Sequence, residues 1–147
     1  MEKQKIKTPM SFLLEECLDV YGESLISVVL FGSRARKFYN ELSDFDIIIV
    51  AEDYKNPNIR EKFLLKYGKK LDVHTFSKQE IIDNFESFSP IFTTLILGKI
   101  ILFDKNRFFI EEFNKFVKRA VSLNIKYCEG GEIWKIKKIA RNLLNSQ

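Results

Sequence analysis

Two aspartates stand directly in front of an apolar, β-branched run in the segment SDFDIIIV, residues 43–50. Alternate residues of a strand face the same side, about 6.5–7 Å apart, so Asp44 and Asp46 share one face. Ile48 and Val50 continue that face as apolar residues, which predicts that it is buried rather than solvated. Two carboxylates at the edge of a buried sheet repel each other and resist the loss of water. The segment therefore predicts a buried strand whose leading carboxylates share cations.

Strand and helix patterns alternate along most of the chain, which predicts an α/β fold. We expect strands within 24–32, 43–51, 69–77 and 99–104 from their β-branched or alternating runs. Helical spacing predicts helices at about 9–21 and 58–67, each stopped by a glycine, a short helix starting at Ser33, and another starting at Pro90. Ser77 with Glu80 three residues later predicts a capping box at the start of a further helix.

The C-terminal part is expected to be helical and basic. Residues 1–105 carry 15 Lys/Arg and 16 Asp/Glu, whereas residues 106–147 carry 9 and 4, so the net charges are −1 and +5. A basic face of this kind is either a solvated helix surface or a surface for nucleic acid or an acidic protein. The stripe Ile133, Ile136, Ala140 and Leu143 needs a cover. A protein partner is the favoured cover, with the protein's own sheet as the alternative.

Length and composition predict one domain over 1–147, divided into a catalytic core at 1–105 and C-terminal helices at 106–147. The N-terminus has no signal-peptide pattern, and the longest apolar stretch is interrupted by Gly98 and Lys99, so no membrane association is expected. Cys17 and Cys128 show no metal-binding or redox spacing, which favours a reducing, cytoplasmic setting.

A third carboxylate and a glycine-serine turn complete a candidate site. Asp72 lies on the polar side of the third expected strand, and it can join Asp44 and Asp46 if that strand neighbours theirs. Such oxygen donors suit Mg²⁺ or Mn²⁺, which bind substrate phosphates as well. Gly32 follows the first strand and allows a phosphate to approach the backbone, while the Ser33 hydroxyl adds a donor. These parts predict phosphoryl or nucleotidyl transfer.

The runs GSRAR, SDFDIIIV and LDV together resemble the signature of the DNA polymerase β-like nucleotidyltransferase superfamily, and within it the minimal nucleotidyltransferase group. The match is close over residues 25–76 and loose over 77–105. It implies a nucleotidyltransferase fold, a small mixed sheet flanked by helices, here followed by a C-terminal helical tail. It also implies transfer of NMP from an NTP, such as AMP from ATP, with two metal ions.

By position, the resemblance assigns Gly32 and Ser33 to the triphosphate-binding turn and Asp44, Asp46 and Asp72 to the metal ligands. Asp72 is also the candidate base. Arg34 and Arg36 are both candidates for a triphosphate contact, because a guanidinium matches phosphate oxygens, and the sequence does not choose between them. His74, on the Asp72 face, is interpreted as a core or rim residue.

The acceptor hydroxyl stays open between several classes. Minimal nucleotidyltransferases often act beside a small helical HEPN-type partner, and some are antitoxins that adenylylate a tyrosine of that partner; the compact chain favours this hypothesis. An RNA-modifying enzyme would use the basic tail to hold phosphates. A small-molecule transferase of the aminoglycoside type and a non-catalytic partner-binding module are the remaining alternatives.

Overall fold

The computed structural model describes residues 8–36, 43–55, 58–123, 126–129 and 132–146, without side chains for 126–135. The fold is mixed α/β, as the sequence predicts. The helices are α1 (Pro9–Tyr21), α2 (Ile59–Tyr67), α3 (Lys78–Glu86), α4 (Pro90–Thr94), α5 (Phe108–Val121) and α6 (Ile136–Asn145). The strands are β1 (Leu25–Phe31), β2 (Phe45–Ala51), β3 (Leu71–Phe76), β4 (Ile100–Asp104), β5 (Lys126–Glu129) and β6 (Glu132–Lys135).

Four strands form one mixed sheet in the order β3-β2-β1-β4. The central strand β1 is antiparallel to both β2 and β4, whereas β2 and β3 are parallel. The parallel pair is joined by α2, which ends at Gly68 in the left-handed conformation. This arrangement confirms the expectation that the Asp72 strand lies beside the Asp44–Asp46 strand, and it confirms the small mixed sheet flanked by helices.

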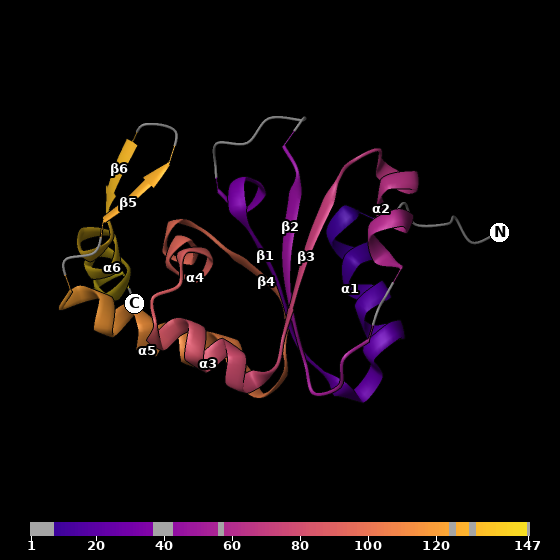
Figure 1. Cartoon of the computed structure of the whole chain (residues 1–147), viewed down its shortest axis with the longest axis horizontal. Coiled ribbons are helices and arrows are strands. Elements are labelled where there is room, and N and C mark those ends of the chain that lie inside the picture. The colour runs from indigo at the N-terminus through magenta and orange to yellow at the C-terminus, as the bar shows by residue number, and fades with distance from the viewer. Residues whose placement is uncertain (1–7, 37–42, 56–57, 124–125, 130–131, 147) are drawn as a thin grey trace.

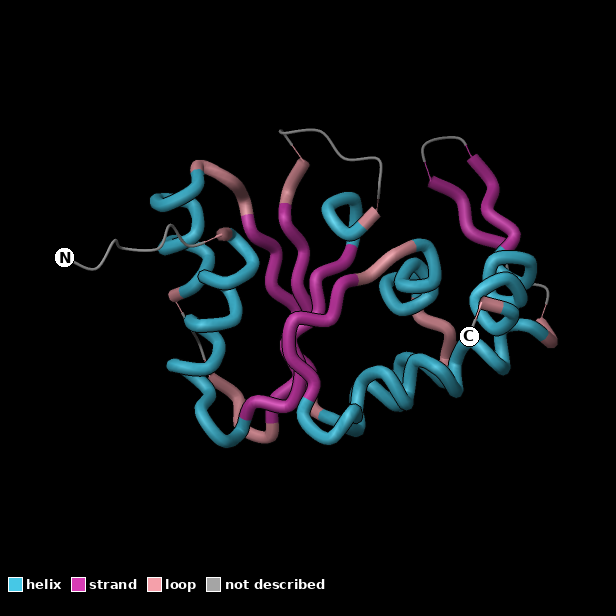
Figure 2. Tube along the Cα trace, turned by 180° about the vertical axis from the view of Figure 1, so that it is seen from behind, coloured by secondary structure: helices cyan, strands magenta, loops and turns pink. Residues whose placement is uncertain are grey.

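Helices cover both faces of the sheet, and each face has its own apolar cluster. Figure 1 shows α1 and α2 on one side of the strands and α3 to α6 on the other, and Figure 2 shows the same layers from behind. The alternation along β2 divides its side chains accordingly. Phe45, Ile47 and Ile49 pack toward α1 and α2. Ile48 and Val50 pack toward the side of α3 to α6.

Local signals account for the ends of several elements. Ser77 and Glu80 form the predicted capping box, in which each side chain accepts a hydrogen bond of 3.1 Å from the other residue's backbone N–H. The expected short helix after β1 is a single 3-10 turn, η2 (Gly32–Ala35). Residues 37–42, which follow it, lie outside the described residues.

The prediction that residues 106–147 contain only helices is wrong. The helices α5 and α6 are present, but β5 and β6 pair as an antiparallel two-stranded sheet between them, with Tyr127 opposite Trp134. The short runs on both sides of Gly-Gly are rich in Tyr, Cys, Ile and Trp, which is typical of a β-hairpin. This pattern, rather than the helical spacing between Ile133 and Ile136, determines the structure of the segment. The stripe therefore begins at Ile136, on α6.

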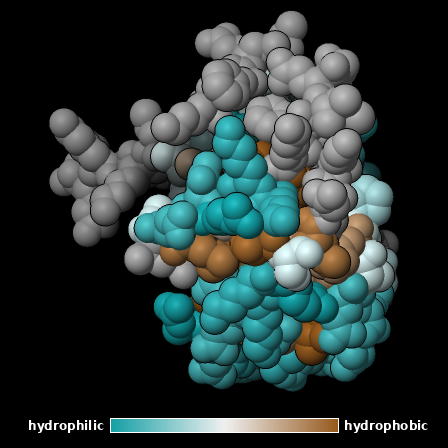
Figure 3. Space-filling model, turned by 90° about the vertical axis from the view of Figure 1, so that its left-hand side faces the viewer, coloured by the Kyte–Doolittle hydropathy of each residue, from teal (hydrophilic) through white to brown (hydrophobic). Residues whose placement is uncertain are grey.

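The buried part of that stripe is covered by the protein's own helix α5, and not by a protein partner. Ile136 and Ala140 are fully buried in the cluster that also contains Phe113 and Phe116 of α5, and Leu143 packs against it. The side view in Figure 3 shows an apolar band that remains at the surface between hydrophilic side chains. In the described part of the chain, the helices are too short or too polar to cross a membrane. The division of the domain at residue 105 stays a prediction.

Candidate active site

The end of β1 and the starts of β2 and β3 meet at one end of the sheet. Phe31 of β1 lies opposite Asp46 of β2, and Asp46 lies opposite Asp72 of β3. Asp44 precedes β2 by one residue and is exposed. The antiparallel pairing of β1 with β2 and the parallel pairing of β2 with β3 thus bring the glycine-serine turn and the aspartates together. Gly32 and Asp72, the first and the last of these residues, are 40 positions apart in the sequence.

The Asp46 carboxyl lies in an environment that opposes its ionisation. Its pKa is raised above the ordinary value of 3.8, first by burial and then by the charge of Asp72, with a smaller contribution from Asp44; His74 acts in the opposite direction. Lys70 lies 3.7 Å from Asp72, but both side chains are largely exposed, so this ion pair contributes little stabilisation. Among the described residues, the surroundings of the Asp46–Asp72 pair thus leave the Asp46 pKa raised, and a cation bound there would favour its ionised form.

Gly32 is required by the position of Asp46. Its φ of +72° lies in the left-handed region, and a Cβ atom built there would stand 2.5 Å from Asp46 Oδ2. A side chain at residue 32 would thus collide with the carboxylate, in addition to straining the backbone. The glycine lets the turn after β1 close over Asp46, while the next residue, Ser33, is partly exposed in η2.

Arg34 and Arg36 occupy different surroundings. Arg34 Nε donates a 3.0 Å hydrogen bond to the Ser43 carbonyl oxygen, and the guanidinium lies 4.4 Å from the centre of the Phe45 ring. Arg34 thereby ties η2 to the start of β2. Arg36 instead lines a pocket together with Gly32 and Asp46. The sequence left these two arginines equivalent, and the structure separates them.

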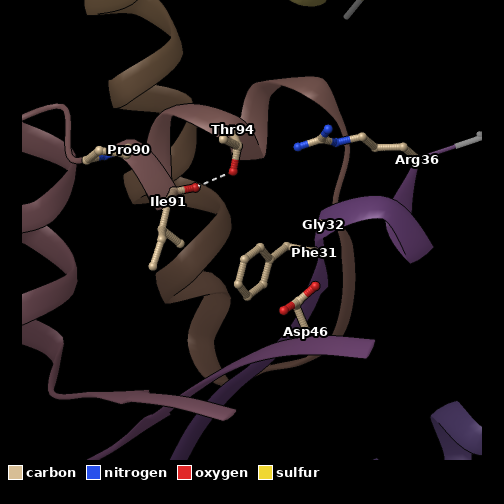
Figure 4. Close-up of a pocket in the computed structure, with 7 residues that line it drawn as sticks. All are labelled: Phe31, Gly32, Arg36, Asp46, Pro90, Ile91 and Thr94. Atoms are coloured by element: carbon tan, nitrogen blue, oxygen red, sulfur yellow. Dashed lines mark hydrogen bonds between the residues drawn. The ribbon is translucent and has the colours of Figure 1, made fainter. Parts of the chain in front are cut away.

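The pocket has a volume of about 220 Å³ and includes residues that the sequence interpretation missed. Figure 4 shows Arg36 extending toward Thr94, with Asp46 and the Phe31 ring on the opposite side. The missed lining residues are Phe31, Pro90, Ile91 and Thr94. Pro90 was recognised as a helix start, but no local signal indicates that α4, some 60 positions after Gly32, faces the turn. Only the folded topology shows it.

The residues present fit a divalent cation by their chemistry. Asp44, Asp46 and Asp72 supply hard oxygen donors, and the crowded pair Asp46–Asp72 would be relieved by positive charge. Within the described ranges, no group of three or more His, Cys, Asp or Glu side chains is gathered closely enough to hold a metal ion. Asp46 and Asp72 lie opposite each other on β2 and β3, and Asp44 lies two residues before Asp46.

Comparisons with known proteins agree with this arrangement. A model of the nucleotidyltransferase domain matches residues 11–142. The putative protein adenylyltransferase MJ1305 of Methanocaldococcus jannaschii is 24% identical over 148 residues, which cover 92% of this chain and 97% of that protein.

Solved structures share the fold. A chain of a doubly mutated toxin–antitoxin complex MntA–HpeT superposes with a TM-score of 0.53 at 16% identity, covering 78% of this chain and 89% of that one. A chain of a toxin–antitoxin complex with AMP-PNP gives the same TM-score and coverage at 17% identity.

Proposed function

The chain belongs to the nucleotidyltransferase domain family, and we propose that it transfers AMP from ATP to a hydroxyl group on a partner protein. The chain is thus an enzyme of NTP-dependent nucleotidyl transfer, as the GSRAR, SDFDIIIV and LDV runs predicted. The observation that carries the proposal is the Asp46–Asp72 carboxylate pair, which lies against the Gly32 turn at one end of the sheet.

The residues divide the work of the reaction. Gly32 and Ser33 hold the triphosphate through the backbone and the hydroxyl of η2. The acceptor oxygen forms a bond to the α-phosphorus of ATP, and the bond from that phosphorus to the bridging oxygen breaks. Pyrophosphate leaves with the electron pair, and Asp72 takes the proton of the acceptor hydroxyl. Mg²⁺ or Mn²⁺ held by Asp44, Asp46 and Asp72 would supply positive charge at the phosphates and lower the pKa of that hydroxyl.

We assign the triphosphate contact to Arg36 rather than Arg34. The Arg34 guanidinium is already used between Ser43 and Phe45, so moving it would disturb the start of β2. Arg36 lines the same pocket as Gly32 and Asp46, where a guanidinium can reach the oxygens of a phosphate held on η2.

A protein acceptor is supported by the names of the relatives. The matched Methanocaldococcus protein carries the name of a protein adenylyltransferase, and the fold recurs in toxin–antitoxin complexes. We therefore favour a tyrosine of a small helical HEPN-type partner, with the reaction in the cytoplasm.

RNA is the second candidate acceptor, because residues 106–147 carry a net charge of +5. No specific observation on the described residues favours a small-molecule acceptor or a purely binding role. Intact-mass spectrometry separates the first two candidates. A short helical protein from a neighbouring gene is used as the candidate partner and is incubated with this protein, ATP and Mg²⁺.

We expect that protein to gain mass in AMP units, and the gain to vanish when Asp44→Asn replaces the wild type. If the partner stays unmodified while RNA gains nucleotides, the acceptor is RNA.

A further inference from the structure

The pocket beside Asp46 has two chemically different sides. One side consists of Gly32, Arg36 and the Asp46 carboxyl, which belong to the phosphate and metal chemistry. The other is the α4 side, formed by Pro90, Ile91 and Thr94, and the Phe31 ring of β1 adds apolar surface beside Asp46. Figure 4 shows the Ile91 side chain directed toward the Phe31 ring, with Asp46 beside that ring. A ligand that fills this space meets apolar surface along its length and a carboxylate at one end.

The α4 side of the pocket is held firmly against the phosphate turn. After α4, the 3-10 turn η3 (Leu95–Leu97) leads to Gly98, which lies close to Ala35 at the end of η2. A Cβ atom at Gly98 would stand 2.9 Å from the Ala35 carbonyl oxygen and 3.2 Å from Arg36 Cγ. Phe92 and Leu95 anchor the same segment in the core. The two sides of the pocket are therefore parts of one packed unit.

Thr94 supplies the polar side chain on the α4 side of the pocket. Thr94 Oγ1 donates a 2.6 Å hydrogen bond to the Ile91 carbonyl oxygen, as the dashed line in Figure 4 marks. A purine base carries donors and acceptors around its whole rim, and burial against Phe31, Pro90 and Ile91 would leave several of them without partners. The pocket is also too small for an entire nucleotide, since sites for drug-sized ligands usually exceed about 300 Å³.

A phenol has the complementary arrangement. Its ring is apolar on both faces, and its single hydroxyl lies at one end, where it can donate to a carboxylate. Resting on the proposed function, we propose that the pocket between Asp46 and α4 receives the aromatic ring of the acceptor tyrosine. The ring packs between Phe31 and Ile91, and the hydroxyl is directed to the Asp46–Asp72 end.

Two acceptor probes test this assignment without a partner protein. N-acetyl-tyrosinamide and N-acetyl-serinamide both offer a hydroxyl, but only the first offers a ring. The wild type is compared with Ile91→Trp, which fills the pocket, and with Ile91→Ala, which removes part of its side. Leu65→Trp is the matched control, because Leu65 is 88% exposed on α2, on the opposite face of the sheet.

We expect Ile91→Trp to lower AMP transfer to the tyrosine probe at least about tenfold and Ile91→Ala to lower it about fivefold, from the lost apolar contact. In Ile91→Ala, transfer to the serine probe stays within twofold, because serine has no ring to lose contact with residue 91. The Kd for ATP stays within twofold in both Ile91 variants, and Leu65→Trp behaves like the wild type. Circular dichroism and urea unfolding check that each variant is folded.

Other results overturn the inference. Weaker ATP binding in Ile91→Trp, with an equal loss for both probes, would assign the pocket to the nucleobase. Unchanged tyrosine transfer in both Ile91 variants would show that the ring binds elsewhere, while the proposed function stands.

If no acceptor receives AMP from the wild type, the proposed function fails. Saturation-transfer NMR of N-acetyl-tyrosinamide then decides the pocket alone: contact that Ile91→Trp abolishes supports it, and its absence overturns it.

Discussion

Asp46 and Asp104 lie at opposite ends of the central strand and have opposite surroundings. Asp46 is paired with Phe31 near the end of β1, and Asp104 is paired with Ser27 near its beginning. The Asp104 carboxylate accepts hydrogen bonds from Ser27 Oγ at 2.7 Å and from the backbone N–H groups of Phe109 and Ile110 at 2.8 and 3.0 Å. Asp46 instead faces Asp72, and its pKa is raised.

The contrast separates a carboxylate that stabilises the fold from one that is available for chemistry. The donors around Asp104 connect β1, β4 and the start of α5, so its charge is compensated within the protein. Within the described residues, burial and the charge of Asp72 instead raise the pKa of Asp46, and a bound cation would stabilise its ionised form. We expect substitutions at the two ends to separate activity from stability.

The largest effect is expected for Asp46→Asn. The amide keeps the shape but removes the charge needed to hold a divalent ion, so AMP transfer should fall about 1000-fold, more than the usual loss for an outer-shell residue. The free energy of unfolding should not decrease, because the substitution removes the repulsion with Asp72. Single-turnover assays and urea unfolding measure the two quantities. Wild-type turnover in a folded Asp46→Asn protein would exclude Asp46 from the site.

Asp104→Ala is the opposite experiment. It leaves the fully buried Ser27 hydroxyl and two N–H groups at the start of α5 without their acceptor, so the free energy of unfolding should fall by about 3 kcal/mol. Ser27→Ala removes one of the three hydrogen bonds and should cost about 1 kcal/mol. Both variants should keep normal transfer per folded molecule. Loss of activity without loss of stability would contradict a structural role for Asp104.

The two arginines repeat this contrast within the site itself. Arg36→Ala should weaken ATP binding about tenfold, because a charge-assisted contact to phosphate is lost. Arg34→Ala should mainly lower stability, by about 1 kcal/mol, because it removes the link between η2, Ser43 and Phe45. Calorimetric titration with ATP, together with urea unfolding, tests both. The reverse pattern would transfer the phosphate contact to Arg34.

The sequence was sufficient for the parts of the site whose residues are close in the chain or regular in pattern. Strict alternation predicted Asp44 and Asp46 on one face of a strand, and the polar side of the next strand identified Asp72. In the structure Asp46 lies in β2, opposite Asp72 of β3, whereas Asp44 directly precedes β2. The assignment of metal-binding and phosphate-binding roles to these residues is a prediction that the experiments above test. The relation between Gly32 and Asp46 required the antiparallel pairing of β1 and β2, which no local pattern specifies.

Features that depend on distant contacts were not accessible in the same way. The α4 side of the pocket is set by packing of Gly98 on Ala35 and Arg36, more than 60 positions away. The role of Asp104 depends on Ser27, 77 positions earlier. The β5–β6 hairpin was not predicted, because runs of four residues fit a helix or a strand about equally well. The Gly-Gly pair between the two runs was the sequence feature that favoured a hairpin.

Gly32→Ala tests whether the glycine serves Asp46 or only the backbone. Gly68 is the matched control, because its φ of +64° resembles the +72° of Gly32, but a Cβ atom at Gly68 meets nothing within 4 Å. Each alanine should cost about 1 kcal/mol of stability for the left-handed conformation. Only Gly32→Ala should also lower transfer, by about tenfold, because its Cβ displaces the carboxylate. Equal activity of the two variants would show that Asp46 tolerates the displacement.

The smallest effect we expect is a pH dependence of stability that Asp46 contributes in the absence of metal. Its folded-state pKa is raised, so the folded protein binds this proton more tightly than the unfolded chain does. Ionisation therefore costs stability. The cost is absent below the ordinary aspartate pKa of 3.8 and develops as the pH rises through the higher, folded-state pKa. The difference in unfolding free energy between Asp46→Asn and the wild type should thus grow in favour of the variant across this window.

Mg²⁺ at neutral pH should reduce that difference by stabilising the wild type more than the variant. Urea unfolding from pH 4 to pH 7, with and without Mg²⁺, measures it, and parallel curves for the two proteins would show that Asp46 is as well compensated as Asp104.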